Sequence, residues 1–289
     1  MKTKLFLITG ITMSLFVGSC QKDSGPTPQV VPSNNPFITK ALNSFCAPDP
    51  KNSIDNGLVG FYPFLKNAND ASGNGNNGTL MDYNALEMNT LGLPVLTDGK
   101  DGSKKSAYLF NGVSNFISLP HNPLWIGSTT DPLFNPGQKV KQFSIYLRIK
   151  PRTVGNLMTL VQFGDAHASF YSAALTINAA KNAEFEWNFI KNTASEGDVV
   201  TGKDIVRANC WTDVTLTYSN AKLSLYLNGK ITGSKTTSFS EGGFLDNFHI
   251  GATAGSFPIR FLDGTIDEVR LYNRSLSDKE IKYLLDHNK

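Results

Sequence analysis

The sequence predicts an all-β fold, a sandwich of two antiparallel sheets with one short C-terminal helix. In most segments after residue 56, apolar and polar residues alternate with a period of two, as in strands with one buried and one polar face. Aromatic residues make up 11% of the 289-residue chain, which favours strands. The pattern of a helix with one apolar face occurs at the C-terminal end.

The alternation is clearest in residues 143–150, FSIYLRIK, where every second residue is apolar. Three further segments alternate in the same way, namely 184–190, 211–218 and 222–230. The turn Ser-Asn-Ala-Lys between the last two predicts a hairpin. The pair Asn111-Gly112 predicts a second hairpin within residues 108–119.

The C-terminal helix is predicted by LSDKEIKYLLDH, residues 276–287. Ser277 and Glu280 have the spacing of a capping box, in which each side chain bonds to the other residue's backbone N–H. Ile281 and Leu284 follow at a spacing that gives the helix one apolar face. We expect one helix of about ten residues.

Residues 1–19 predict a signal peptide. Lys2 and Lys4 precede an apolar segment, residues 5–17, which is too short to span a bilayer comfortably. The segment leads into VGSC, which resembles a bacterial lipobox, so Cys20 is expected to carry the lipid anchor of a lipoprotein. An ordinary secretory signal cut near Ser19 is the alternative.

Residues 20–55 predict an extended tether, and residues 56–289 predict the folded domain. The stretch SGPTPQVVPSNNP, residues 24–36, has the Pro-rich and polar composition of a linker. The QKDS after the lipidated cysteine resembles the export signal of surface lipoproteins in Bacteroidetes-type bacteria. We therefore expect an outer-membrane lipoprotein that faces the outside of the cell; an anchor that faces the periplasm is the alternative.

The charge balance excludes a nucleic-acid partner. The formal net charge is +3, and it becomes +1 (25 basic against 24 acidic residues) once Lys2 and Lys4 leave with the signal peptide. Binding to nucleic acid requires a larger basic excess. The sequence contains no motif of a serine hydrolase, a zinc protease or a phosphate-binding loop, and its four His are scattered.

Cys46 and Cys210 remain once Cys20 is lipidated. An even pair in an oxidising compartment predicts a disulfide. In the chain-entropy model such a bridge would stabilise the fold by roughly 4–5 kcal/mol. Two unpaired thiols are the alternative.

Five stretches follow one another in a familiar order: GLVGFYPFLKNANDASGNGNNGTL, SAYLFNGVSNFISLP, FSIYLRIKP, WTDVTLTYSNAKLSLYLNGK and FLDGTIDEVRLYNRSLSDKEI. Together they resemble the laminin-G-like subgroup of the concanavalin A-like lectin/glucanase superfamily, over residues 57–285. The resemblance implies a jelly-roll sandwich. It also implies a non-catalytic module that binds glycans or proteins, often with a structural calcium ion.

The chain departs from the family pattern in three places. Arg148 stands where the family often has Trp. Asn111, Ser114 and Asn115 stand where the family often has paired acids. The insertion at residues 123–140 is unusually long, and we expect a specificity of its own there.

Calcium is the expected cofactor. Ca²⁺ prefers six to eight oxygen ligands, and the loop NDASGNGNNG supplies carboxylate and amide oxygens in a turn-rich stretch. Family geometry would bring this loop near Asp267 in the last strand, so the resemblance implies a site formed by Asp70, Asn74, Asn77 and Asp267. The alternative is a loop in which Asn and Asp only satisfy their own backbone.

A glycan is the expected ligand, on the polar faces of the central strands. Tyr can stack on a sugar ring, and Arg can donate paired hydrogen bonds. Trp125, in the insertion, is the Trp most expected to be exposed. The predicted ligand-binding residues are Tyr146, Arg148, Glu186, Asn188, Tyr226 and Trp125.

Enzymatic activity is not expected. Glu184 and Glu186 lie at i, i+2 on one strand, a spacing that a retaining glycosidase could use, but EFEWN lacks the Glu-x-Asp-x-x-Glu pattern of relatives that hydrolyse β-glucans. The expected function is a cell-surface lipoprotein whose lectin-like domain binds a polysaccharide or mediates adhesion. The alternatives are a protein-interaction module of an outer-membrane assembly, built on residues 126–140, and a glycoside hydrolase.

Overall fold

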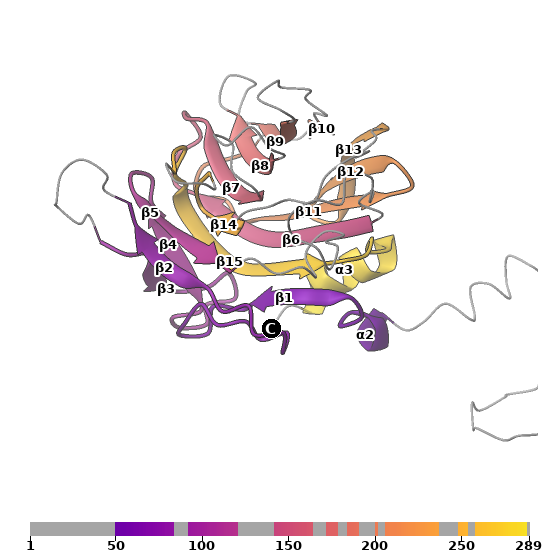
Figure 1. The fold of residues 1–289 in the computed structure, drawn as a ribbon, viewed down its shortest axis with the longest axis horizontal. Helices are drawn as coiled ribbons and strands as arrows, with labels where there is room; N and C mark the ends of the chain where they lie inside the picture. The colour runs from indigo at the N-terminus through magenta and orange to yellow at the C-terminus, as the bar shows by residue number, and fades with distance from the viewer. Residues whose placement is uncertain are drawn as a thin grey trace, which may run out of the picture. The chain divides into compact units, whose positions relative to one another are not determined.

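The computed structural model describes residues 50–83, 92–120, 142–163, 172–178, 184–190, 200–201, 206–236, 248–253 and 258–287. In these residues two antiparallel sheets face each other, and one short helix follows the last strand (Figure 1). The predicted all-β sandwich with a C-terminal helix is therefore confirmed. A helical turn, α2 (Pro50–Ser53), precedes the first strand. Within the described ranges, no helix is long and apolar enough to cross a membrane.

The first sheet has eight strands: β1 (Leu58–Tyr62), β3 (Val95–Thr97), β4 (Ala107–Asn111), β6 (Gln142–Pro151), β11 (Thr212–Ser219), β12 (Lys222–Leu227), β13 (Lys230–Thr236) and β15 (Asp263–Tyr272). Seven of them follow the order β13-β12-β11-β6-β15-β4-β3, and β1 pairs with β15. The predicted hairpin between β11 and β12 is confirmed, and it turns at Asn220 and Ala221, which both have positive φ.

The second sheet has seven strands: β2 (Thr79–Asp82), β5 (Asn115–Leu119), β7 (Met158–Phe163), β8 (Ser172–Asn178), β9 (Glu184–Ile190), β10 (Val200–Thr201) and β14 (Phe248–Ile250). Their order is β10-β9-β8-β7-β14-β5-β2. Every pair of neighbouring strands is antiparallel.

The hairpin predicted at Asn111-Gly112 is wrong. The tight turn is present, with Gly112 at a φ of 76°, but β4 and β5 belong to different sheets. Phe110 before the turn and Ile117 after it are both fully buried in the same core. The turn therefore carries the chain from one layer to the other, which the local sequence does not distinguish from a hairpin.

Strand β15 joins the parts of the eight-stranded sheet. Strand β6 pairs with one side of β15, while β4 and β1 share the other side, at residues 263–266 and 269–272 respectively. A β-bulge between Ile266 and Glu268 makes Asp267 the extra residue. Because of the bulge, Ile266 and Val269 both face the core although they are three residues apart.

The main core lies between the two sheets, where the apolar residues of the alternating segments meet. The inward residues of β6, β12 and β8 are almost fully buried, as the alternation predicted for β6 and β12: Phe143, Ile145, Leu147, Ile149, Leu223, Leu225, Leu227, Leu175 and Ile177. At about 25 cal/mol per Å² of apolar surface removed from water, this layer is the largest stabilising contribution to the fold.

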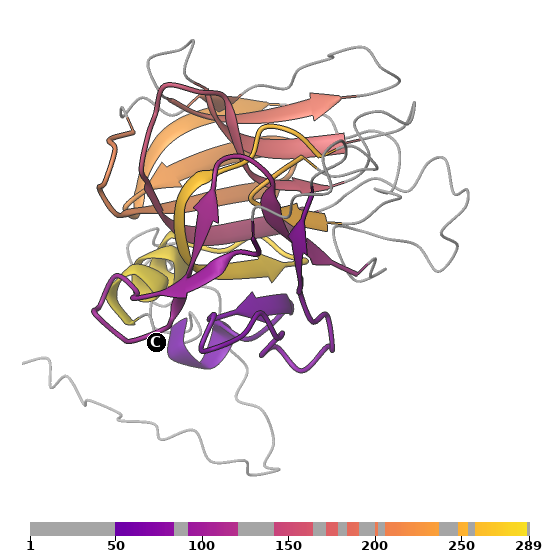
Figure 2. The ribbon, with the colours of Figure 1, turned by 90° about the vertical axis from the view of Figure 1, so that its left-hand side faces the viewer.

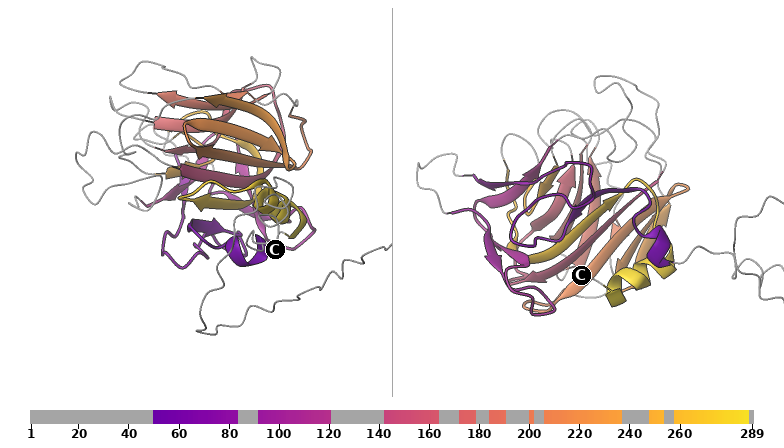
Figure 3. Two further views of the ribbon diagram at one scale, coloured as in Figure 1. Left: turned by 90° about the vertical axis from the view of Figure 1, so that its right-hand side faces the viewer. Right: turned by 90° about the horizontal axis from the view of Figure 1, so that it is seen from below.

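The outer face of the eight-stranded sheet is covered rather than solvated. Helix α3 (Asp278–His287) packs Ile281 and Leu284 against Tyr146 and Tyr272 of that face. Helices α2 and α3 lie side by side (Figure 3). Strand β6 is thus buried on both faces along most of its length.

The predicted capping box of α3 is confirmed. The Ser277 N–H donates to Glu280 Oε2 at 2.8 Å, and the Glu280 N–H donates to Ser277 Oγ at 3.4 Å. Glu280 also accepts hydrogen bonds from Arg274 Nη2 at 2.8 Å and from the Ser53 hydroxyl at 2.7 Å. Ser53 and Ile54 therefore pack with the domain, although the sequence prediction assigned both to the tether.

The Glu280 carboxylate makes a pH-dependent contribution to stability. Burial alone would raise the pKa of Glu280, but hydrogen bonds from Arg274, Ser277 and Ser53 lower it from 4.5 to about 2. Because the folded-state pKa is the lower one, this stabilisation is complete above about pH 4.5 and is lost as the pH falls toward 2.

We expect Glu280→Gln to lower the free energy of unfolding at pH 7 by roughly 1–2 kcal/mol, after allowance for solvent screening. It should also flatten the pH dependence of stability between about pH 4.5 and 2. Urea unfolding at several pH values measures both effects. Asp286→Asn, which removes a surface pair with Lys282 in the same helix, is the control. Equal losses in the two variants would contradict the role assigned to Glu280.

Candidate functional site

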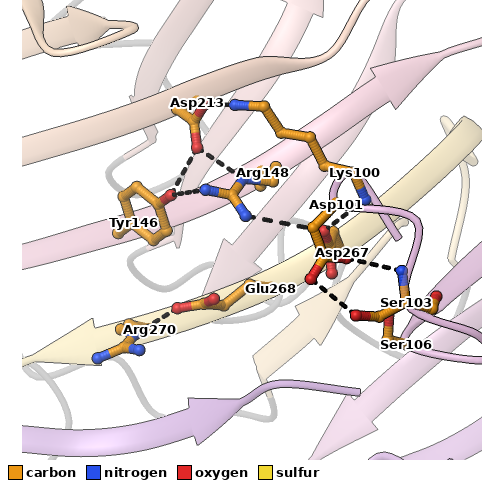
Figure 4. A network of polar contacts seen from close by, with 10 residues as sticks. All are labelled: Lys100, Asp101, Ser103, Ser106, Tyr146, Arg148, Asp213, Asp267, Glu268 and Arg270. Atoms are coloured by element: carbon orange, nitrogen blue, oxygen red, sulfur yellow. Dashed lines mark hydrogen bonds and ion pairs between the residues drawn. The ribbon is translucent and has the colours of Figure 1, made fainter. Parts of the chain in front are cut away.

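A cluster of charged side chains fills the middle of the outer face of the eight-stranded sheet (Figure 4). We call it the polar cluster, and its members come from β6, β11, β15 and the loop before β4: Lys100, Tyr146, Arg148, Asp213, Asp267, Glu268 and Arg270. Because β6 pairs with β11 on one side and β15 on the other, Arg148 lies between Asp213 and Glu268. Lys100 is the most exposed member, with 33% of its side chain accessible.

Asp213 accepts hydrogen bonds from three members of the polar cluster. Its Oδ1 accepts from the Tyr146 hydroxyl at 2.5 Å and from Arg148 Nε at 2.8 Å, and its Oδ2 accepts from Lys100 Nζ at 2.5 Å. Burial alone would raise the pKa of Asp213, but the charge of Arg148 and the hydrogen bonds from Lys100 and Tyr146 lower it. Burial and the nearby carboxylate raise the pKa of Tyr146, so its hydroxyl keeps its proton and donates it.

Asp267, the bulge residue, attaches the loop before β4 to the sheet. Its Oδ2 accepts from the Lys100 N–H at 2.9 Å and lies 3.8 Å from Arg148 Nη1. Gly99 makes this approach possible, because a Cβ there would lie 2.4 Å from Ser106 Oγ and 3.1 Å from both carboxylate oxygens of Asp267. Any side chain at position 99 would push the loop off the cluster.

Glu268 and Arg270 complete the polar cluster toward β1. Glu268 is fully buried and forms an ion pair with Arg270. Burial raises the pKa of Glu268, and the charge of Arg270 opposes that effect. The Arg270 guanidinium also lies over the Phe61 ring, 4.0 Å from its centroid. The cluster thus pairs its charges internally, as buried charges require.

The structure does not bring the predicted ligand-binding residues together. Tyr146 and Arg148 lie in the polar cluster, and the Tyr226 hydroxyl donates to Asp278 of α3 at 3.0 Å. Glu186 and Asn188 lie on β9 of the other sheet. These residues therefore lie on two separate faces and not in the single groove that we expected. The reason is that the polar sides of β6 and β9 point away from each other. Trp125 lies outside the described residues.

The outer face of the seven-stranded sheet carries a second set of polar side chains, which we call the polar row. Cross-strand pairing places Glu186 beside Thr176, Thr176 beside Thr159, Gln162 beside His249, and His249 beside Ser118. Its members are Glu186, Thr176, Thr159, Gln162, His249 and Ser118. Glu186, Gln162 and His249 are at most 4% exposed.

Two members of the polar row are held by neighbours outside it. Asn178 donates to Glu186 Oε2 at 2.5 Å. His249 Nδ1 lies 2.8 Å from the Thr253 carbonyl, so it donates its proton there. The Phe116 ring packs against the imidazole, with centroids 4.5 Å apart. The row therefore combines a carboxylate, an amide and an imidazole, with an aromatic ring beside it.

Sequence reasoning missed Gln162 and His249. A bulge between Thr159 and Val161 breaks the alternation of β7, and β14 is only three residues long. In such short or interrupted strands the period-two signal is too weak to assign faces. The signal that could have found them is two polar residues, each flanked by large apolar residues, in LVQF and FHI.

The predicted calcium ligands do not meet at one site. Asp70, Asn74 and Asn77 lie in the Asn-rich loop (residues 67–78) after β1, whereas Asp267 bonds to Lys100 in the loop before β4. Within the described part of the chain, no group of three or more His, Cys, Asp or Glu residues could hold a metal ion. The residues present therefore do not fit the shared site that the resemblance implied.

The remaining predicted residues concern cysteine chemistry. Cys210 is exposed, but its expected disulfide partner Cys46 lies outside the described residues. Cys20 lies outside them as well. The disulfide and the lipid anchor thus stay predictions.

Comparisons with known proteins agree with this architecture. A family model described as the concanavalin A-like lectin/glucanases superfamily matches residues 115–282. Domain 4 of AbnA, a GH43 extracellular arabinanase from Geobacillus stearothermophilus solved with arabinotriose, is similar at a TM-score of 0.57 and 22% identity, over 79% of this chain and 98% of that chain. A search of curated proteins finds no match.

Two other solved structures are similar. The ligand-binding domain of botulinum neurotoxin serotype D, in complex with N-acetylneuraminic acid, has a TM-score of 0.55 and 15% identity over 82% of this chain and 52% of that chain. Trypanosoma rangeli sialidase has a TM-score of 0.51 and 18% identity over 79% of this chain and 32% of that chain. At these identities the likeness concerns the fold alone.

We expect that breaking a buried ion pair of the polar cluster lowers the free energy of unfolding far more than breaking an exposed ion pair of the loop before β4. Asp213→Ala leaves the buried Arg148 charge uncompensated, so we expect it to lower the free energy of unfolding by about 3–5 kcal/mol. Lys104→Ala removes a pair with Asp98 in which the lysine side chain is 83% exposed, and we expect little change. Urea unfolding at pH 7 measures both. A small loss for Asp213→Ala would show that the cluster does not hold this face.

Proposed function

Because the chain belongs to the concanavalin A-like lectin/glucanases superfamily, we propose that its domain binds carbohydrate on the outer face of the seven-stranded sheet. Similar structures come from an arabinanase domain bound to arabinotriose and a toxin domain bound to N-acetylneuraminic acid. They support a carbohydrate ligand as a class, without naming the sugar.

The polar row is the observation that carries this proposal. Sugar hydroxyls both donate and accept hydrogen bonds, and the carboxylate of Glu186, the amide of Gln162 and the imidazole of His249 offer both kinds of partner. The Phe116 ring, itself 3% exposed, packs beside the imidazole. The members of the polar row and of the polar cluster are both largely buried. The polar cluster consists mainly of charges that pair with one another, whereas the polar row combines a carboxylate, an amide, an imidazole and hydroxyls, the groups that sugar hydroxyls bind, so the polar row is the better candidate.

We propose that the domain binds without catalysis. A retaining glycosidase requires two carboxyl groups about 5–5.5 Å apart. The cross-strand neighbour of Glu186 on β8 is Thr176, and the next on β7 is Thr159, neither of which is a carboxylic acid. Glu184 lies two residues away on β9, but EFEWN lacks the Glu-x-Asp-x-x-Glu pattern of relatives that hydrolyse β-glucans. The alternative is a protein-interaction module built on residues 126–140, a segment outside the described residues. We therefore place the binding site on the outer face of the seven-stranded sheet.

A polysaccharide array probed with the purified domain tests the binding proposal. We expect binding to at least one polysaccharide class without release of reducing sugar. Gln162→Ala and the nearly isosteric Glu186→Gln should each weaken it by about tenfold, which is 1.4 kcal/mol. Lys282→Ala on α3 is the control, and thermal unfolding identifies variants that no longer fold. Binding to none of the polysaccharides would refute the proposal, and hydrolysis abolished by Glu186→Gln would replace it with an enzyme.

We also propose that a lipid on Cys20 holds the protein in the outer membrane, facing outward. The support is the lipobox-like VGSC and the QKDS that follows it. Cys20→Ala should move the protein from the membrane fraction to the soluble fraction, since the acyl chains supply the anchoring free energy. Protease treatment of intact cells reports the orientation. If Cys20→Ala stays in the membrane fraction, the lipid is not the anchor.

A further inference from the structure

We infer that the Asn-rich loop caps the free edge of β1 with its own hydrogen bonds and needs no calcium to do so. This inference does not rest on carbohydrate binding. It concerns a loop whose composition, rich in oxygen donors, suggested a metal site. In the structure, the polar side chains of this loop bond to strand β1 instead.

Strand β1 needs such a cap, because among the described strands it pairs only with β15. An unpaired strand edge presents backbone N–H and C=O groups that either bond to water or pair with another chain. In Figure 2 the Asn-rich loop is part of the segment that follows β1 and turns back beside it. The loop therefore lies where a further strand would otherwise be.

Amide side chains of the loop bond to the edge carbonyls. Asn74 Nδ2 donates to the Leu58 carbonyl at 3.0 Å, and Asn76 Nδ2 donates to the Val59 carbonyl at 2.7 Å. The Asn76 carbonyl in turn accepts from the Tyr62 hydroxyl at 2.7 Å. These side chains thus act as the backbone N–H groups of a missing strand would.

Phe61 has both of its backbone groups bonded to the loop. Its N–H donates to Asp70 Oδ1 at 2.9 Å, and its carbonyl accepts from the Ala71 N–H at 2.7 Å. This is the two-bond exchange of a paired residue in an antiparallel ladder, with a carboxylate oxygen in place of one carbonyl. The loop is therefore bonded to the backbone of Leu58, Val59 and Phe61 and to the side chain of Tyr62.

The Asp70 carboxylate has no oxygen position left for a cation. Oδ1 accepts from the N–H groups of Phe61 and Ser72 at 2.9 and 2.8 Å, and Oδ2 accepts from the Ser72 hydroxyl at 2.9 Å and the Asn76 N–H at 3.0 Å. Four donors fill the roughly four lone-pair sites of a carboxylate. Each donor also points its positive end at the site, which repels Ca²⁺.

Asp267, the other carboxylate among the predicted calcium ligands, also contacts protein groups. Asp267 accepts from the Lys100 N–H, lies 3.8 Å from the Arg148 guanidinium, and leaves no room beside Gly99. Three N–H groups and a hydroxyl thus surround the Asp70 carboxylate, while a backbone N–H and a guanidinium lie beside that of Asp267. The two loops are held separately, each by its own aspartate.

The test compares thermal unfolding of the purified domain in EDTA and in millimolar CaCl₂, for wild type and three variants. We expect the wild-type Tm to be equal in the two buffers. Asp70→Ala should lower Tm by about 5 °C or more in both, because it leaves the Phe61, Ser72 and Asn76 donors unpaired. Asn76→Ala should act in the same direction. Asn69→Ala, an exposed change in the same loop, should leave Tm unchanged.

Evidence of bound calcium would overturn the inference. It would be a calcium-induced rise in the wild-type Tm that disappears in Asp70→Ala, or one equivalent of bound calcium in elemental analysis of the wild-type protein. An Asp70→Ala variant with the same Tm as Asn69→Ala would also overturn it. If Asp70→Ala does not fold, Asn76→Ala supplies the same comparison, and the wild-type measurement with calcium stands without any variant.

Discussion

The divided pairing of β15 is the constraint on which the rest of the structure depends. One side of this strand is paired with β6 along its length, while β4 and β1 share the other side. The strand can serve three neighbours because the bulge at Asp267 changes which residues face the core partway along it. Asp267 is thereby turned toward the loop before β4, and Glu268 and Arg270 are turned toward the outer face.

The two outer faces of the sandwich then take different roles. The eight-stranded sheet fills its outer face with α3 and with charges that pair internally, so that face holds the fold together. Buried ion pairs seldom add net stability over apolar packing. Removing one partner of such a pair nevertheless costs several kcal/mol, so a single substitution in the polar cluster is strongly destabilising. The polar row on the other sheet combines polar side chains of different chemistry from five strands, which suits it better to ligand contact.

Much of the fold follows from the sequence, because the alternation in β6, β11 and β12 identifies their inward residues directly. The capping box of α3 is equally local, and it is confirmed to the residue. The hairpin predicted at Asn111-Gly112 fails because a tight turn looks the same whether it stays in one sheet or crosses to the other. Only the packing of Phe110 and Ile117 from opposite layers distinguishes the two cases.

The candidate site follows from the sequence much less completely. Alternation shows that Tyr146 and Arg148 share a face, but it carries no information on what covers that face. Arg148 was expected to reach a ligand and instead meets Asp213, a contact 65 residues away in sequence. Gln162 was hidden by the bulge in β7, since one extra residue reverses every later assignment of faces.

The joint between α2 and α3 has a mechanical consequence. The chain enters the domain at Pro50, and Arg274 binds the carbonyls of Ser53 and Asn56 at 2.8 and 2.5 Å. Tension applied to the chain before Pro50 would load this guanidinium and the Glu280 carboxylate before it reached β1 and the sheet. A domain pulled from that end would therefore bear the load first at a short polar latch, formed by Arg274 and Glu280.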